Sequence, residues 1–526
     1  MEFLVNIYCH GIFTERHSFS ALHLDGTSWK YYINAQECYN SLYTFELRLF
    51  LPFHMKKIWI FFFITICLFA CRKEQSILTP PPPAKNSLPI TVTIDESQPG
   101  NTISQTFEGL SYETGILAES PEILNVNNRI LIQLIKNLGP GLLRIGGDSS
   151  DEVFWTGGAR NAGSGKDSLT TSDIDRLADF SHAIGWPVLF GLNLGTNNPA
   201  AAANESQYTY NKLGNSLYAL QAGNEPDVYH LFGLRNPDYS SANYQAEFEN
   251  YKAVIQSVVP QVSFAGPGIA YNTDWITSFA DNENNNIKLI DAHYYVAGPA
   301  TDSSIDYQTI LSNNDKLSNM LQIINKESLQ YHLPYRITEC NSVYGGGKTG
   351  VSDVFASALW ALDLMWTIAA NNGQGINFHG GNHLVYSPIT IENGIITARP
   401  VYYAMLAFKF AGPGSTFIAS NMNQNGFNCS AYASLNADNT RTVTLINKDD
   451  SNNFYFTVQA GKTISTIQIA RLTAPSITSG TGVSFAGGTV NNDGTFNLGV
   501  TEHFVINNKS FGVNVPAGSA AVITLQ

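Results

Sequence analysis

The sequence of 526 residues is poor in charged residues, and its charge balance excludes some classes of partner. Charged residues make up 13% of the chain, a low share for a globular protein. Acidic residues outnumber basic ones by 42 to 29, which gives a net charge of −13. This surplus argues against nucleic acid or an anionic membrane surface as the main partner. An acidic substrate would need local cations or backbone amides, because the overall field repels it.

Cysteines are also scarce. If the N-terminal segment is processed as described below, only Cys340 and Cys429 remain as free candidates. Two cysteines provide neither a disulfide framework nor the ligand spacing of a metal site. We therefore expect no metal and no cofactor, and we interpret Cys340 as a small buried residue. The six cysteines of the chain are Cys9, Cys38, Cys67, Cys71, Cys340 and Cys429.

The apolar run near the N-terminus, Ile58 to Ala70, is too short to span a membrane. It follows Met55-Lys56-Lys57, and a basic segment before such a run is typical of a signal peptide, here residues 55–70. Leu68-Phe69-Ala70-Cys71 resembles a bacterial lipobox, in which Cys71 is lipidated and becomes the mature N-terminus. Because a signal peptide begins near the initiator, we expect residues 1–54 to be an over-extended gene prediction. The alternative for the run is a buried hydrophobic helix.

A proline-rich spacer, residues 71–87, comes next. Its Thr79-Pro80-Pro81-Pro82-Pro83-Ala84 stretch is a stiff polyproline segment, suited to holding a domain away from a membrane. These features predict a lipid anchor and a place in the bacterial cell envelope, either in the periplasm or on the outer surface. No motif indicates an oligomeric state.

Short apolar strands alternate with helical patterns between residues 105 and 400. This alternation is typical of a (β/α)8 TIM barrel. A doubly wound open sheet is the alternative, but no glycine-rich phosphate-binding motif follows the first strand. The eight predicted strands are residues 107–112, 142–145, 187–194, 218–222, 263–266, 290–295, 335–338 and 376–379.

Two helices of the predicted barrel have recognisable ends. Ser172-Asp173-Ile174-Asp175 has the spacing of a capping box, with Asp in place of Glu or Gln, and the helix should close at Gly185. Val351 to Ala370 is a long apolar helix with a plausible C-cap at Asn371-Asn372-Gly373.

The composition changes after Pro413-Gly414, where Thr, Asn, Ser, Val and Gly become frequent. Short alternating runs such as Thr442–Asn447 are separated by turn signals. We predict an antiparallel β-sandwich over residues 401–526. A strand segment at residues 88–104 precedes the barrel, and we expect it to pair into this sandwich.

Polar residues gather at the carboxyl ends of the predicted strands, where barrel enzymes keep their catalytic groups. The fourth strand runs into Asn224-Glu225-Pro226, and the proline forces the chain out of the sheet. Glu339 ends the seventh strand, so two carboxyl groups could flank a glycosidic bond. The alternative is an ordinary polar loop. Other strand ends offer Ser111, Tyr112, Glu113, Arg144, Asp148, His293, Tyr294, Tyr295, Asn341 and His379.

Several longer motifs accompany this pair: Leu143-Arg144-Ile145-Gly146-Gly147, His293-Tyr294-Tyr295, Glu339-Cys340-Asn341-Ser342-Val343-Tyr344-Gly345-Gly346-Gly347, Asn377-Phe378-His379-Gly380-Gly381 and Tyr386-Ser387-Pro388. In this order and spacing they resemble glycoside hydrolase family 79, the β-glucuronidase and heparanase family among the clan A retaining glycosidases. The resemblance covers roughly residues 88–526.

The resemblance implies that Glu225 is the general acid/base and Glu339 the nucleophile of a double displacement. Burial or the neighbouring carboxylate must then raise the pKa of Glu225. Asn224 would hydrogen-bond the sugar 2-hydroxyl. Arg144 would keep Glu339 ionised and oriented, with a surface salt bridge as the alternative.

Neighbouring side chains on a strand point to opposite faces, so only one of Tyr294 and Tyr295 can face the barrel lumen. We favour Tyr295 as the hydroxyl donor to Glu339. His293 is either a site residue or a core histidine. Glu113, Asp148 and His379 are further candidates for substrate binding.

A glucuronide substrate carries a carboxylate that must be met by donors. The loop Tyr344-Gly345-Gly346-Gly347-Lys348 offers backbone amides at close approach, and Lys348 and Tyr386 are further candidates. A flexible linker is the alternative for the triple glycine. No dense Lys/Arg cluster marks a long sulfated polysaccharide as the ligand.

We therefore expect an exo-acting β-glucuronidase, with 4-O-methylglucuronate as a second possible sugar. An endo-acting, heparanase-like enzyme is the first alternative. Another clan A activity, such as a xylanase or an arabinofuranosidase, and a non-catalytic carbohydrate-binding lipoprotein are the others.

Overall fold

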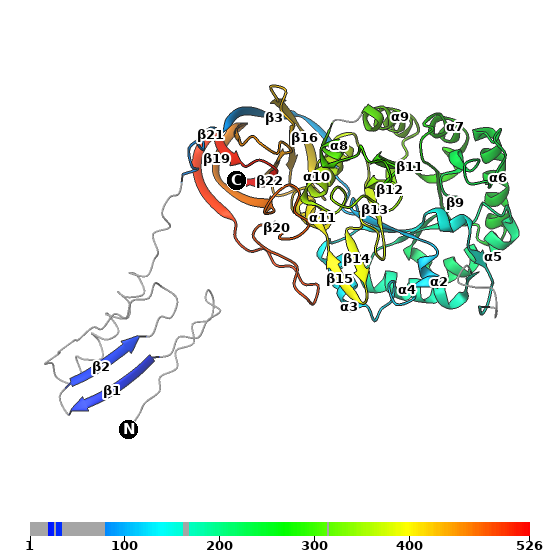
Figure 1. Ribbon diagram of the computed structural model, residues 1–526, viewed down its shortest axis with the longest axis horizontal. Coiled ribbons are helices and arrows are strands. Elements are labelled where there is room, and N and C mark those ends of the chain that lie inside the picture. The colour runs from blue at the N-terminus through cyan, green and yellow to red at the C-terminus, as the bar shows by residue number, and fades with distance from the viewer. Residues whose placement is uncertain (1–18, 26–27, 34–78, 161–167, 313–314) are drawn as a thin grey trace. The chain divides into compact units, whose positions relative to one another are not determined.

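The computed structural model describes residues 79–160, 168–312 and 315–526, and a hairpin of β1 (Phe19–Asp25) and β2 (Ser28–Ile33). The chain divides into two compact units, Met1–Ser76 and Ile77–Gln526, and the second unit carries all of the elements discussed below (Figure 1). The predicted signal peptide and Cys71 lie outside the described residues. Within the described part, no helix has both the length and the apolar character of a membrane span.

Eight parallel strands close into a barrel, which confirms the predicted fold class. Most of these strands are buried along their whole length, as expected for a parallel sheet covered on both faces. Each strand overlaps one of the eight predicted from the sequence. In barrel order they are β10 (Phe264–Ile269), β11 (Ile287–Ala297), β12 (Tyr335–Val343), β13 (Ile376–Gly380), β4 (Gly109–Glu113), β5 (Leu142–Gly146), β8 (Val188–Leu192) and β9 (Leu217–Ala222).

Helices surround this barrel (Figure 1). The longer ones are α3 (Arg129–Asn137), α4 (Thr171–Ile184), α5 (Pro199–Leu213), α6 (Ser241–Val258), α7 (Asp274–Glu283), α9 (Asp315–Tyr331), α10 (Phe355–Ala370) and α11 (Pro400–Ala411). Short elements in the loops are α2 (Ile116–Glu119), α8 (Tyr307–Leu311), β6 (Phe154–Trp155), β7 (Ser168–Leu169), the strand pair β14 (Ile389–Glu392) and β15 (Ile395–Ala398), and the 3-10 turns η1 (Asp148–Asp151), η2 (Gly214–Ser216) and η3 (Pro226–Val228).

Two helix starts differ from the prediction. The capping box of α4 is formed by Thr170 and Asp173, so the predicted box at Ser172 was wrong by two residues. Asp173 is buried and its carboxylate also accepts from the Thr170 hydroxyl, which anchors this register. Helix α10 begins at Phe355 rather than Val351, because the free N–H groups of its first turn bond to carbonyls of residues 477 and 479 in the C-terminal domain.

Helix α11 completes the barrel. Most of its residues are buried and belong to the same hydrophobic core as the barrel strands. The barrel therefore extends one helix past the predicted border at residue 400, and the first strand of the C-terminal sheet begins at Thr416. The apolar side chains all around α11 explain this placement, since such a helix must be covered on every side.

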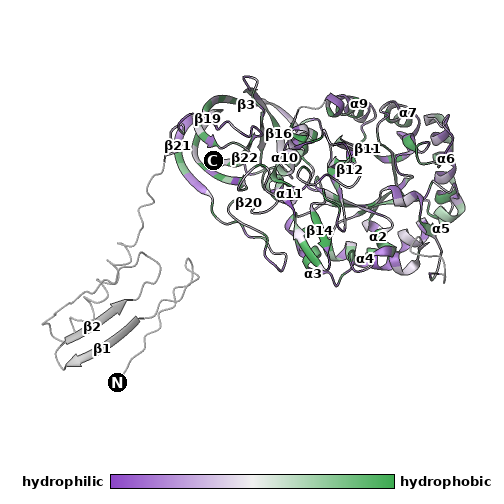
Figure 2. Ribbon diagram, in the orientation of Figure 1, coloured by the Kyte–Doolittle hydropathy of each residue, from purple (hydrophilic) through white to green (hydrophobic). Residues whose placement is uncertain are grey.

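The C-terminal sheet is built from β16 (Thr416–Asn423), β17 (Cys429–Leu435), β18 (Arg441–Asn447), β19 (Phe454–Thr473), β20 (Ser484–Phe485), β21 (Glu502–Val515) and β22 (Ser519–Leu525). The segment before the barrel forms β3 (Leu88–Thr102) and joins this sheet, as predicted. It pairs antiparallel with β16 and parallel with β19, so one pairing departs from the expected antiparallel pattern. Hydrophobic and hydrophilic residues alternate along β19 and β21 (Figure 2).

Candidate active site

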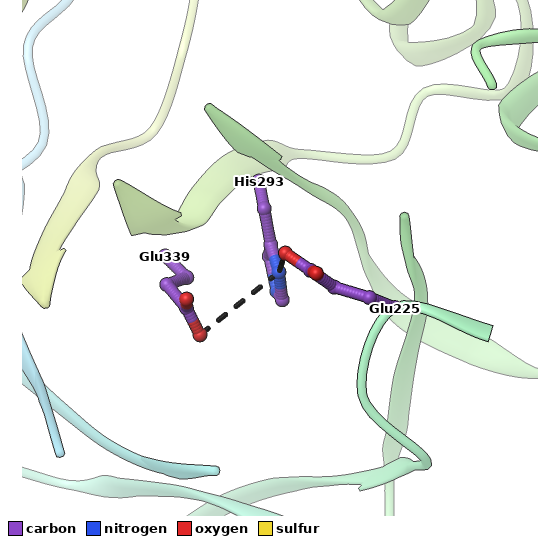
Figure 3. A group of neighbouring side chains, drawn as sticks. All are labelled: Glu225, His293 and Glu339. Atoms are coloured by element: carbon purple, nitrogen blue, oxygen red, sulfur yellow. Dashed lines mark hydrogen bonds and ion pairs between the residues drawn. The ribbon is translucent and has the colours of Figure 1, made fainter. Parts of the chain in front are cut away.

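Two glutamates meet at the carboxyl ends of barrel strands. Glu339 lies on β12, and Glu225 follows β9 after the turn at Gly223. Glu225 has a left-handed backbone (φ 52°, ψ 52°), which turns its side chain out of the strand direction. Its N–H bonds to the carbonyl of Gly268. One carboxyl oxygen of each glutamate and a ring nitrogen of His293 lie within 4.8 Å of one another (Figure 3).

Glu339 is held by donors on both oxygens. Arg144 Nη1 lies 2.7 Å from Oε2, and the Tyr295 hydroxyl donates to Oε1 at 2.8 Å. His379 Nδ1 lies 3.8 Å from Oε2. Burial by itself raises the pKa of Glu339, but the charges of His379 and Arg144 and the Tyr295 hydrogen bond outweigh it and lower the pKa well below the ordinary value. Glu339 is therefore ionised at neutral pH.

Arg144 is fixed by four hydrogen bonds and is fully buried. Besides Glu339, it donates to Ser111 Oγ, to Gln221 Oε1 and to Asn224 Oδ1, at 2.8–3.0 Å. The surface salt bridge considered from the sequence is thus excluded. Gly146, two residues along β5, leaves the space for this side chain, since a Cβ there would lie 2.6 Å from the guanidinium carbon.

Glu225 has the opposite electrostatic environment. Burial and, next, the negative charges of Glu339 and Asp148 raise the pKa of Glu225 well above its ordinary value. His293 Nδ1 lies 2.9 Å from Glu225 Oε1. Burial lowers the pKa of His293 to about 3, so the ring is neutral. His293 is therefore a site residue, and a neutral Nδ1–H can donate to Oε1 while Oε2 carries the glutamic acid proton.

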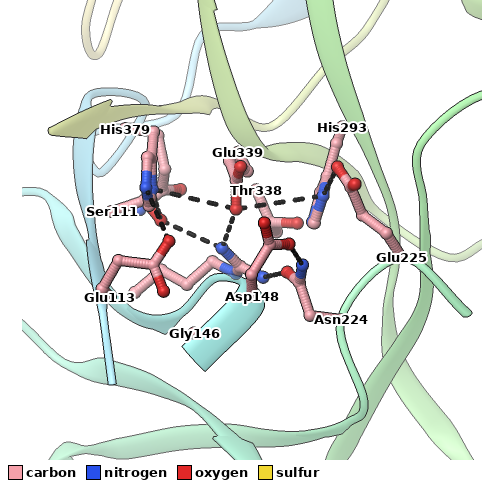
Figure 4. A network of polar contacts seen from close by, with 12 residues as sticks. Ser111, Glu113, Gly146, Asp148, Asn224, Glu225, His293, Thr338, Glu339 and His379 are labelled. Atoms are coloured by element: carbon pink, nitrogen blue, oxygen red, sulfur yellow. Dashed lines mark hydrogen bonds and ion pairs between the residues drawn. The ribbon is translucent and has the colours of Figure 1, made fainter. Parts of the chain in front are cut away.

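Asn224 is oriented by its neighbours. Its Oδ1 accepts from Arg144. Its Nδ2 donates to Asp148 Oδ1 at 3.0 Å (Figure 4). Because a side-chain amide has two N–H groups, one remains for a sugar hydroxyl. Burial and the charges of Glu339 and Glu113 raise the pKa of Asp148 to about 7.

His379 links the first and last barrel strands. Its Nε2 lies 3.2 Å from Glu113 Oε1 and its Nδ1 lies 3.0 Å from Ser111 Oγ (Figure 4). Burial by itself lowers the pKa of His379, but Glu339 and Glu113 outweigh it and raise the pKa above its ordinary value. This shift favours the cationic form of the ring, which stabilises the Glu339 carboxylate.

Two residues that matter here were not predicted. Asp151 is buried and accepts hydrogen bonds from the N–H of Asn224 and from the Tyr229 hydroxyl, so it fixes the chain just before Glu225. Tyr271 follows β10 and is 60% exposed, with its ring centroid 6.5 Å from that of Tyr344. The available signals were an acid three residues after Asp148 and an aromatic residue soon after the fifth strand.

The predicted glycine loop follows β12. Gly345 and Gly346 have φ values of 82° and 91°, and within the described residues their N–H groups have no hydrogen-bond partner. Tyr344 and Tyr386 flank Tyr295, with ring centroids 6.4 and 6.1 Å from its ring. The Lys348 ammonium instead contacts the carbonyl of Asp302.

The convergence of Glu225, His293 and Glu339 is also the spacing that a metal site requires. Spacing along the sequence did not predict it, because the three side chains come from different strands. The donor set fits a metal poorly, since Glu225 holds its proton and Arg144 already neutralises Glu339. The group is better suited to proton transfer.

A buried pair of glutamates with opposite pKa shifts, at the mouth of a (β/α)8 barrel, is the arrangement of a glycoside hydrolase active site. Comparison with known proteins then narrows the class. Residues 112–365 match the N-terminal domain of glycosyl hydrolase family 79, and residues 431–522 match the C-terminal beta domain of the same family. The chain belongs to glycoside hydrolase family 79.

Related proteins match this chain at low sequence identity. A beta-glucuronidase of Aspergillus niger is 27% identical over 352 residues, which cover 58% of this chain and 65% of that protein. A beta-glucuronidase of Neurospora crassa is 23% identical over 466 residues, covering 74% of this chain and 79% of that protein. The crystal structure of a 4-O-alpha-L-rhamnosyl-beta-D-glucuronidase from Fusarium oxysporum has the same fold, with a TM-score of 0.66, 20% identity, and coverage of 85% of this chain and 99% of that one.

Proposed function

We propose that the protein is a retaining exo-β-glucuronidase. The observation that carries the proposal is the approach of a Glu225 oxygen and a Glu339 oxygen to within 4.8 Å. This spacing suits retaining enzymes, whose carboxyl groups lie about 5–5.5 Å apart, and is too short for inverting ones. The beta-glucuronidase activity of the two relatives supports the choice of sugar.

The proposed first step is attack by Glu339 on the anomeric carbon. A bond forms from its carboxylate oxygen to that carbon as the bond to the leaving oxygen breaks, and Glu225 gives its proton to the leaving oxygen. The product is a covalent glycosyl-enzyme. In the second step Glu225, now a carboxylate, takes a proton from water, and the resulting hydroxide displaces Glu339. Two inversions give net retention.

In this proposal the glycine loop after β12 binds the carboxylate of the substrate. The N–H groups of Gly345 and Gly346 make no backbone hydrogen bond within the described residues and are available to the carboxylate, and the hydroxyls of Tyr344 and Tyr386 are further candidate donors. Lys348 contacts a main-chain carbonyl, so the backbone amides are the main contact. The low number of basic residues favours exo action over cleavage within long sulfated chains.

The test is a panel of p-nitrophenyl glycosides that includes the β-glucuronide, β-glucoside, β-xyloside and α-arabinofuranoside. We expect turnover of the glucuronide alone, persistence in excess chelator, and its loss in Glu339→Gln. NMR of the early product should show the β-anomer. An α-anomer, or preference for an uncharged sugar, would contradict the proposal, and activity that is insensitive to Glu339→Gln would indicate a contaminating enzyme.

The leaving group provides a sharper test of the acid role. Glu225→Ala should lower turnover of natural glycosides by roughly 10²–10⁴-fold, the usual contribution of a general acid. Aryl glucuronides with good leaving groups should lose much less, because they need little protonation. Equal losses on both substrate types would count against Glu225 as the acid.

The same proposal places the enzyme on a lipid anchor in the bacterial cell envelope. It rests on the sequence around Cys71, which lies outside the described residues. In a bacterial host, the wild type should incorporate labelled fatty acid and sediment with membranes, and Cys71→Ser should do neither. A Cys71→Ser protein that still incorporates label and sediments would refute the anchor.

A further inference from the structure

A small cavity outside the catalytic pair lies beside η1. It has a volume of about 160 Å³, enough for roughly five water molecules. Its walls come from the segments that follow β5 and β8 and from the first turns of α5. Because these segments leave the carboxyl ends of barrel strands, the cavity lies on the same face as Glu225 and Glu339.

Glu205 is the unusual residue of this cavity. Its side chain lines the cavity from α5, it is only 5% exposed, and within the described residues it has neither a hydrogen-bond partner nor an ion-pair partner. Burial raises the pKa of Glu205 to about 8, so at neutral pH the carboxyl group is mostly protonated. It then offers one O–H donor and one acceptor oxygen to whatever fills the cavity. Because the carboxyl group faces the cavity and makes no hydrogen bond to the described part of the chain, it is available to a ligand there.

Aromatic rings form the other side. Phe154 lines the cavity with 58% of its surface exposed. Next to it, Trp155 is held by a hydrogen bond from Nε1 to Asn204 Oδ1 and by packing on Tyr208, with ring centroids 5.6 Å apart. A pyranose ring presents an apolar face of C–H groups and a rim of hydroxyls, which matches aromatic rings beside a neutral carboxyl group.

A short network of hydrogen bonds connects the cavity to the segment that follows β9 and carries Asn224 and Glu225. The N–H groups of Leu194 and Gly195 both donate to Asp151, whose second oxygen accepts from the N–H of Asn224. Asn193, a cavity residue, donates to the carbonyl of Val153 on the opposite wall. The cavity is therefore rigidly placed relative to Asn224 and Glu225.

We propose that the Glu205–Phe154–Trp155 cavity binds an uncharged sugar residue of the glycan that carries the cleaved glucuronate. This inference rests on the proposed function and adds a remote specificity site to it. The Glu205 carboxyl group hydrogen-bonds sugar hydroxyls, and the aromatic rings cover the apolar face of the sugar. Such a site acts on binding of long substrates and leaves short ones untouched.

The experiment compares p-nitrophenyl β-glucuronide with cellotetraose that carries a terminal β-glucuronosyl group. In Glu205→Leu, KM for the oligosaccharide should rise about tenfold or more, while kcat/KM for the aryl glucuronide stays within about twofold. Glu205→Gln, which keeps a donor and an acceptor, should resemble wild type. Phe154→Ala should follow Glu205→Leu more weakly. The Tm of Glu205→Leu should equal or exceed that of wild type, because an unpartnered polar group has been removed.

Equal behaviour of both substrates in folded Glu205→Leu would overturn the inference, and so would a fall in Tm with loss on both, which marks a structural role. If wild type cleaves neither glucuronide, the proposed function fails. The cavity is then judged by calorimetric titration of wild type and Glu205→Leu with cellotetraose. Binding that Glu205→Leu abolishes supports the site, and no binding to wild type overturns it.

Discussion

At the scale of single residues, the proposed chemistry depends on Glu225 and Glu339, which have identical side chains but opposite pKa shifts. Glu339 has Arg144, Tyr295 and His379 around it, whereas Glu225 faces a neutral His293 and two acids. The first set stabilises a carboxylate and the second set stabilises a carboxylic acid. The division of roles therefore follows from the neighbours and not from the glutamates themselves.

Tyr295 provides the cleanest test of this division. Tyr295→Phe removes the hydroxyl that donates to Glu339 Oε1 and keeps the ring packing. A hydrogen bond to a charged group contributes about 1.5–3 kcal/mol, so kcat should fall roughly 10- to 150-fold. Because the lost bond favoured the carboxylate, the pKa of Glu339 should rise and the acid limb of the kcat/KM profile should move to higher pH. An unchanged acid limb would argue against this role.

A variant of Asp148 tests the role of Glu225, the second carboxyl group of the pair. Its negative charge helps to raise the pKa of Glu225, and the alkaline limb of activity appears where Glu225 loses its proton. Asp148→Asn removes that charge, so the pKa of Glu225 should fall and the alkaline limb should move to lower pH. The measurement is the pH profile of kcat/KM on p-nitrophenyl β-glucuronide. A shift to higher pH would show that the sign is wrong.

The sequence predicted the residues that lie directly at strand ends and missed those placed by the loops. Glu225, Glu339 and Arg144 stand beside strands with clear apolar patterns. Tyr271 reaches the site because Asp227 accepts three consecutive backbone N–H groups of its loop. Such a side-chain-to-backbone clamp leaves no periodic signal in the sequence.

At the scale of elements, the start of α4 shows how a local pattern can be misassigned. Both Thr170 and Ser172 can act as an N-cap, and both have an acid three residues later. The tertiary structure decides between them, because Thr170 and Asp173 are buried whereas Ser172 is exposed. The capping pattern of the sequence therefore does not distinguish Thr170 from Ser172 as the N-cap.

This difference can be measured. Thr170→Ala should cost about 0.5–2 kcal/mol in the free energy of unfolding, since it removes the acceptor for the Asp173 N–H. Ser172→Ala is the matched control and should stay within about 0.5 kcal/mol of wild type. Urea unfolding followed by circular dichroism gives both values. A larger loss for Ser172→Ala would restore the original assignment.

At the scale of the whole molecule, the barrel core extends into the C-terminal sheet, which also has a second core of its own. The pattern of the sequence changes between them, from alternating strands and helices to strands alone. The predicted border at residue 400 falls at the start of α11, an apolar helix whose residues pack in the barrel core. A helix of this kind is covered on one side by the barrel and on the other by the C-terminal sheet.

The contact between the barrel and the C-terminal sheet includes both aromatic packing and polar contacts. Trp366 of α10 is fully buried and stacks on Tyr432 of β17, with ring centroids 5.6 Å apart. On the same helix, Asp363 accepts from the Tyr432 hydroxyl at 2.8 Å and from Lys448 Nζ at 2.7 Å. The two parts share apolar and polar contacts, so neither should be stable without the other.

We therefore expect residues 77–526 to unfold in a single calorimetric transition. Trp366→Ala should lower the free energy of unfolding by about 3–5 kcal/mol and keep the transition single, because both parts lose the same contact. Val500→Ala, at a side chain that is 79% exposed, is the control and should stay within about 0.5 kcal/mol of wild type. Two separate transitions in Trp366→Ala, with only one of them displaced, would show that barrel and sheet are independent folding units and that the catalytic barrel does not depend on the sheet behind it.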